Sequence, residues 1–108
     1  MTKEIDKSLV IKLEESIEYA ADSIVSKTVV KKDTGTVTLF GFDKGQGLSK
    51  HSAPFDAIVQ VLDGTANIII DDTGYRLQKG DMIIMPANVP HAVEAADRFK
   101  MLLTMIKS

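Results

Sequence analysis

The feature that most constrains this chain is an alternation of apolar and polar residues with a period of two, which runs through nearly all of the sequence after residue 22. Such alternation predicts half-buried β-strands, because successive side chains on a strand point to opposite faces. Turn signals rich in glycine and aspartate interrupt it roughly every ten residues. Eight strand segments are predicted, at residues 24–31, 36–42, 57–62, 66–70, 75–77, 82–85, 91–95 and 99–106.

Two turns set the expected order of these strands. Asp63 and Gly64, between segments 57–62 and 66–70, favour a tight two-residue hairpin, since both central residues of such a turn need positive φ. Asp71 and Asp72 predict the next turn. Short strands with frequent turns are typical of an all-β sandwich or barrel.

Only residues 8–21 depart from the strand pattern. Leu9, Leu13 and Ile17 would share one face of a helix, so a short amphipathic helix is expected there. We therefore expect an N-terminal segment at residues 1–22 that packs on the barrel, and the barrel itself at residues 23–108.

Composition excludes several classes of function. The chain of 108 residues has no cysteine, which rules out a disulfide framework, a thiolate nucleophile and a zinc site built on sulfur. Thirteen basic and fifteen acidic residues give a net charge of -2 without a basic stripe, so nucleic acid is not an expected partner. Because no apolar run is long enough to span a bilayer and no secretory signal is recognisable, we expect a cytoplasmic protein with no membrane partner.

The chain contains two histidines, His51 and His91, and each lies at a fixed distance from a glycine. His51 follows Gly45 after five residues, and Gly64 closes that stretch. If the two histidines meet in space, they are the only imidazole pair available for metal or acid-base chemistry.

These stretches resemble the two motifs of the cupin superfamily. The first family motif is glycine, five residues, histidine, one residue, histidine, three or four residues, glutamate, six residues and glycine. The second is glycine, five residues, proline, one residue, glycine, two residues and histidine, and it is matched by Gly80, Pro86 and His91, with Asn88 in the second glycine slot. Asn88 suits that slot because asparagine tolerates positive φ. The resemblance covers about residues 40–105 and implies a double-stranded β-helix, or jelly-roll barrel.

The resemblance also implies a metal held by three histidines and a glutamate, but two of those slots are changed. Ala53 occupies the second histidine slot and Ala57 the glutamate slot, and a methyl group cannot coordinate a metal. Asp56 should point away from the site, unless a bulge at Pro54 turns it inward to complete a triad of two histidines and one carboxylate. A divalent transition metal on His51 and His91 would otherwise be weakly held.

The two alanines are expected to enlarge an apolar cavity whose polar features are the imidazoles. The leading hypothesis is a barrel that binds a small organic ligand through His51, His91, Val59 and Met101. The methionines at positions 82, 85, 101 and 105 are expected to fill gaps in the core, although they could also be considered as soft metal ligands.

Two alternatives remain open. One is a metal-dependent enzyme of the dioxygenase, isomerase or decarboxylase type that uses His51 and His91. The other is a non-catalytic sensory or structural module that works through its dimer surface. A homodimer is expected in either case, with the apolar side of residues 5–17 contributing to it.

Overall fold

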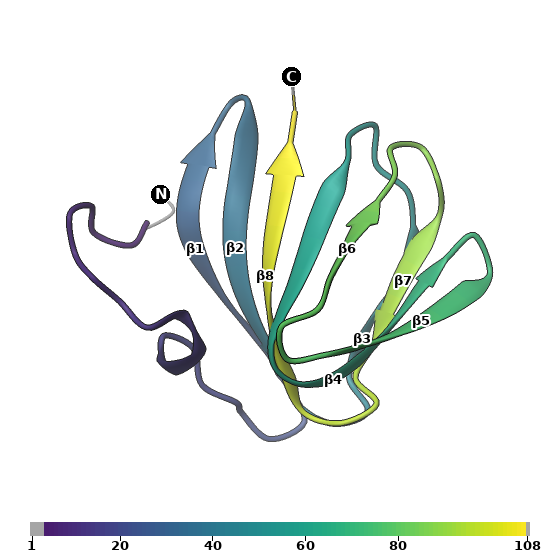
Figure 1. Cartoon of the computed structure of the whole chain (residues 1–108), viewed down its shortest axis with the longest axis horizontal. Coiled ribbons are helices and arrows are strands. Elements are labelled where there is room, and N and C mark those ends of the chain that lie inside the picture. Colours follow the sequence, from purple (N-terminus) through teal and green to yellow (C-terminus); the bar gives the residue numbers. More distant parts are fainter. Residues whose placement is uncertain (1–3, 108) are drawn as a thin grey trace.

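The computed structural model describes residues 4–107, which form two curved antiparallel sheets facing each other (Figure 1). One sheet has the strand order β1-β2-β8-β4-β6 and the other β3-β7-β4-β5. The expected jelly-roll barrel is confirmed. The strands are β1 (Ile24–Lys32), β2 (Gly35–Phe42), β3 (Gly47–His51), β4 (Ala57–Ile70), β5 (Thr73–Gln78), β6 (Met82–Met85), β7 (His91–Glu94) and β8 (Phe99–Ile106).

Strand β4 belongs to both sheets. Its first half pairs with β6 and β8, and its second half pairs with β5 and β7. The hairpin expected at Asp63 and Gly64 is therefore wrong, because the strand continues through both residues. Gly64 has φ +77°, and a Cβ added there would lie 1.6 Å from the carbonyl oxygen of Arg98. Glycine is required at this point by the close approach of two backbones, not by a chain reversal.

The tight turn lies eight residues further along the chain. Asp71 and Asp72 have φ values of 47° and 68°, and Ile70 pairs with Thr73 directly across them. Positive φ at both central residues is the geometry of a type I′ hairpin, so the turn expected here is confirmed. Asn88 has φ 65°, which confirms that it takes the conformation of the glycine it replaces.

Strand β3 is not among the eight segments expected from the alternation. Four of its five residues are exposed and only Leu48 is partly buried, so the strand carries little period-two signal. It pairs with β7, with a register shift between Leu48 and His51. An extra residue in one strand is a β-bulge, and this bulge precedes His51 instead of following it at Pro54.

The core lies between the two sheets. The rings of Phe42 and Phe99 stack with centroids 4.5 Å apart and an interplanar angle of 7°. Burying a side chain of this size contributes about 1.5–3 kcal/mol to stability. The core cluster consists of Phe42, Ala57, Val59, Val61, Ala66, Ile68, Leu77, Met85, Val93, Ala95, Phe99 and Met101.

The amphipathic helix expected over residues 8–21 is wrong in extent, since the structure has a single 3-10 turn at Leu13–Glu15. Ser8 has φ 60°, and Lys12 at the start of the turn offers no side-chain cap. Without a cap the first backbone N–H groups of a longer helix would lack partners. Ile17 is buried at 4% exposure, but Leu9 remains 59% exposed. Among residues 4–107, no helix is long and apolar enough to cross a membrane.

The N-terminal segment, defined here as residues 4–22, is fastened to the barrel by polar contacts. The Tyr19 hydroxyl donates a hydrogen bond of 2.6 Å to the carboxylate of Asp63. The cationic groups of Arg98 and Lys100 lie 4.9 and 5.1 Å from the centre of the Tyr19 ring. Burial and the hydrogen bond to Asp63 raise the pKa of Tyr19 well above its ordinary value, so the hydroxyl stays protonated.

Candidate functional site

The structure brings the two histidines together. His51 ends β3, His91 begins β7, and the two residues are register partners. Their ring centroids lie 4.5 Å apart, with an interplanar angle of 67°. The bulge in β3 allows this arrangement, because it adds one residue to the spacing between Leu48 and His51.

Each imidazole is oriented by a backbone carbonyl two residues earlier. Nδ1 of His51 lies 2.7 Å from the carbonyl oxygen of Ser49, and Nδ1 of His91 lies 3.3 Å from that of Val89. A carbonyl can only accept a hydrogen bond, so Nδ1 carries the proton in each neutral ring. Both Nε2 atoms are therefore left with a free lone pair, which can accept a hydrogen bond or bind a metal.

The two rings differ in their exposure to solvent. His91 is 6% exposed, whereas His51 is exposed at the end of its strand. Burial, reinforced by the nearby His51 ring, holds the pKa of His91 below its ordinary value. His91 is thus a neutral imidazole at neutral pH, and His51 is the group that a ligand meets first.

Both histidines line a cavity of about 50 Å³ inside the barrel. A water molecule needs roughly 10–15 Å³ by this measure, and pockets for drug-sized ligands span roughly 300–1,000 Å³. The cavity therefore has room for an ion or for a few non-hydrogen atoms. Its walls are otherwise apolar, and it is lined by Leu48, His51, Ala53, Ala57, Met85, His91, Val93, Met101, Leu103 and Met105.

Some of the residues expected at the site line this cavity and one does not. Met101, Ala53 and Ala57 contribute to its walls, as expected. Val59 does not, because it is fully buried in the core further along β4. Three methionines, Met85, Met101 and Met105, also line the cavity.

The sequence did not single out Met85 as a cavity residue. The signal was its position on β6, where it is the register partner of Ala57. Met105 is the partner of Ala57 on the other side, from β8. Recognising this row of three requires the strand pairing, which the sequence does not specify.

Asp56 does not join the histidines. Its carboxylate accepts a hydrogen bond of 2.9 Å from the backbone N–H of Ala87, and it does not line the cavity. Within residues 4–107, no group of three or more histidine, cysteine, aspartate or glutamate side chains is placed to hold a metal ion. The residues present therefore do not fit the set of three histidines and a carboxylate that the resemblance implies.

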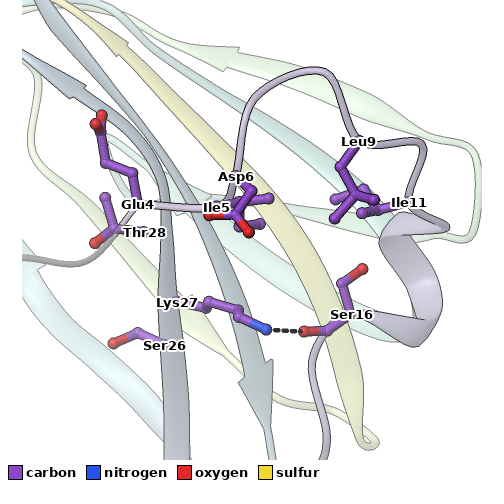
Figure 2. Close-up of a pocket in the computed structure, with 9 residues that line it drawn as sticks. All are labelled: Glu4, Ile5, Asp6, Leu9, Ile11, Ser16, Ser26, Lys27 and Thr28. Atoms are coloured by element: carbon purple, nitrogen blue, oxygen red, sulfur yellow. Dashed lines mark hydrogen bonds between the residues drawn. The ribbon is translucent and has the colours of Figure 1, made fainter.

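A second, more open cleft of about 550 Å³ lies between the N-terminal segment and β1. Figure 2 shows Leu9 and Ile11 on the side of the N-terminal segment and Ser26 and Thr28 on the side of β1. The ammonium group of Lys27 crosses it to donate a hydrogen bond of 3.3 Å to a backbone carbonyl of the N-terminal segment. None of the site residues expected from the sequence lines this cleft.

Comparison with known proteins defines the family. Residues 38–107 match the family model for the cupin domain, so the chain belongs to the cupin family. No curated protein matches the chain significantly.

Solved structures agree with this assignment. A conserved protein of unknown function from Streptococcus pyogenes is 38% identical, with a TM-score of 0.93 over 99% of this chain and 94% of that one. A cupin 2 conserved barrel domain protein from Leptotrichia buccalis is 44% identical, with a TM-score of 0.87 over 90% of this chain and 47% of that one. A salicylate 1,2-dioxygenase from Pseudaminobacter salicylatoxidans shares the fold at 18% identity, with a TM-score of 0.72 over 80% of this chain and 27% of that one.

Proposed function

We propose that this cupin is a small-ligand-binding protein in which His51 and His91 make the polar contacts. The observation that supports this is the pairing of two imidazoles, one buried and one exposed, on a cavity whose other lining side chains are apolar. An apolar pocket with a few convergent polar groups is the usual form of a small-molecule site.

The side chains that line the cavity limit the class of ligand that can bind there. Both Nε2 atoms are acceptors, so they match a ligand with hydroxyl or N–H donors. Among residues 4–107, no carboxylate, lysine or arginine lines the cavity, so an uncharged ligand is favoured over an ionic organic one. The small volume limits the buried part to a few atoms, and the rest of the molecule would extend past exposed His51 into solvent.

The test is a screen of neutral fragments of up to about eight non-hydrogen atoms, followed through the imidazole nitrogens by NMR. We expect a binding fragment to shift the Nε2 signals of His51 and His91, and we expect the His51→Ala, His91→Ala double variant to lose binding. Fragments that bind equally well to the double variant would refute the proposal, as would a screen in which no fragment moves either imidazole signal.

A matched pair of variants on β4 controls for indirect effects. Ala57→Val adds two methyl groups inside the cavity and should block the fragments without removing an imidazole. Gln60→Val makes a β-branched side chain on the exposed face of the same strand and should leave binding unchanged.

The alternative of a metal-dependent enzyme has less support from the cavity. A divalent metal on His51 and His91 would need its remaining positions filled by water or by atoms of a ligand. Among the described residues, the cavity supplies neither a carboxylate nor a third imidazole. The dioxygenase that shares the fold does so at an identity that supports the fold alone.

We also propose that two copies of the chain associate through the N-terminal segment. Val10 is 97% exposed and neighbours Leu9 and Ile11, which border the cleft against β1. The cleft is lined by the apolar Ile5, Leu9 and Ile11 and by polar residues. An exposed apolar side chain beside such a cleft on the same molecule suits an isologous dimer, in which each copy inserts Val10 into the cleft of the other. Sedimentation should show a dimer for the native chain and a monomer for Val10→Asp, with Ile84→Asp as the exposed control. A native chain that sediments as a monomer would refute this.

The cytoplasmic location and the lack of a nucleic-acid partner stay predictions from the sequence.

A further inference from the structure

Three methionines meet at the cavity that holds the histidines. Met85 lies on β6, and Met101 and Met105 lie on β8. Met85 and Met101 are almost fully buried, and Met105 is partly buried. Met82 was grouped with them on sequence grounds, but it is 55% exposed and does not line the cavity.

The position of two of these methionines relative to Ala57 is informative. Ala57 is the register partner of Met85 on one side and of Met105 on the other. Residues directly opposite each other on neighbouring strands have Cβ atoms about 4.5–5.5 Å apart. The place where the family motif has a carboxylate is therefore a methyl group flanked by two thioether side chains.

Among the described residues, the side chains that line the cavity carry only soft or borderline donors, and all of these are neutral. They are the imidazoles of His51 and His91, whose Nε2 lone pairs are free, and the thioethers of Met85, Met101 and Met105. Thioethers favour Cu(I) and imidazole suits copper, whereas magnesium, calcium and manganese prefer oxygen ligands. In the part of the chain that the structure describes, no lining side chain carries an oxygen ligand.

The neutral charge of the donors and the small volume of the cavity also favour a single monovalent ion. Burying a dication among neutral donors leaves two charges uncompensated, whereas a monovalent ion leaves one. A volume of about 50 Å³ accommodates a single ion with its donors close around it. Met85 and Met101 belong to the core cluster, so the same side chains pack the core and border the cavity beside the two imidazoles.

We propose that this cavity is a Cu(I) site, in which His51 and His91 supply nitrogen and Met85, Met101 and Met105 supply thioether sulfur. This inference rests on the proposed role of the two histidines as the ligand-contacting groups of the cavity. It does not require the organic ligand.

The test is a Cu(I) titration of the full chain, without oxygen and with ascorbate, against the competing chelator bicinchoninate. We expect one equivalent of Cu(I) to bind and the double variant Met85→Leu, Met105→Leu to bind at least about tenfold more weakly. Leucine conserves volume, so this variant should still fold. Met82→Leu is the matched control and should bind as tightly as the native chain.

A second measurement locates the ion. In a sample with ¹³C-labelled methionine methyl groups, Cu(I) should shift the signals of Met85, Met101 and Met105 and leave the signal of Met82 in place. Equal Cu(I) affinity in the native chain and in the Met85→Leu, Met105→Leu variant would overturn the thioether site, as would unmoved methyl signals. Neither result would contradict the proposal that small fragments bind at the histidines. If Cu(I) still binds after both histidines are replaced, however, the role of the histidines in the Cu(I) site and in ligand binding would be contradicted.

Discussion

The substitution Gly64→Ala should be among the most damaging single-methyl changes in this protein. Gly64 lies where β4 passes from one sheet to the other, opposite the first residue of β8, Phe99. Alanine would bring two separate penalties there. Its backbone would keep φ at +77°, and its Cβ would lie 1.6 Å from the carbonyl oxygen of Arg98.

The magnitude follows from the geometry. The left-handed conformation alone costs an L-residue roughly 1–2 kcal/mol. Real Cβ atoms do not approach within 3.0 Å of a backbone atom, so the two chains must separate by at least 1.4 Å, from 1.6 to 3.0 Å. Such a displacement strains or breaks hydrogen bonds between β4 and β8, each worth about 0.5–1.5 kcal/mol. It also disturbs Phe99, which is fully buried and stacked on Phe42. We expect a total of about 3–5 kcal/mol, or a fall in Tm of roughly 12–20 °C.

Alanine substitutions at two other glycines distinguish the cost of positive φ from the cost of the steric clash. Gly80 has φ +92° but open space around the added Cβ, so Gly80→Ala should cost only the conformational part, about 1–2 kcal/mol. Gly74 has neither positive φ nor a close neighbour, and Gly74→Ala should be nearly neutral. The assay is urea unfolding of all three variants. If Gly64→Ala costs no more than Gly80→Ala, the close approach of β4 to β8 is not what requires glycine.

Three further outcomes are expected. Because the pKa of Tyr19 is raised in the folded state, its contribution to the free energy of unfolding is complete below pH 10 and is lost as the pH rises further. Between about pH 9 and pH 11 the free energy of unfolding should therefore fall more steeply for the native chain than for Tyr19→Phe, and equal slopes against pH would refute this. Asp56→Ala should lose the hydrogen bond to Ala87, cost about 0.5–1.5 kcal/mol by urea unfolding and leave Cu(I) affinity unchanged, whereas a large drop in affinity would restore Asp56 as a ligand. Met101→Ala should cost about 2–5 kcal/mol by thermal unfolding, because Met101 is buried, and a cost below about 1 kcal/mol would contradict its place in the core.

The fold was largely predictable because its strands carry a clear period of two. Strands β1, β2, β5, β6, β7 and β8 agree with the expected segments to within two residues at each end. The errors arose where a local signal has more than one physical cause. Asp63 and Gly64 have the composition of a hairpin turn, but the same glycine also serves a close backbone contact, and only the tertiary structure distinguishes the two.

The site was predictable in its two histidines and in Met101, but not in Met85. His51 and His91 occupy positions of the two cupin motifs, so their place in the barrel follows from the resemblance to that family. Met85 contacts the cavity because β6 pairs with β4 in one particular register, which brings it beside Ala57. Contacts between strands depend on pairing, and no pattern within a single segment encodes them.

Strand β4 also has a consequence for how the protein opens. Since β4 pairs with β5, β6, β7 and β8, neither sheet can separate from the barrel without breaking hydrogen bonds to the same fourteen residues. Strands β1, β2 and β3 do not pair with β4, so partial unfolding that spares β4 is confined to these three strands and the N-terminal segment. Amide hydrogens of β4 should exchange with solvent only when the whole chain unfolds, which would make their exchange rates a direct measure of global stability.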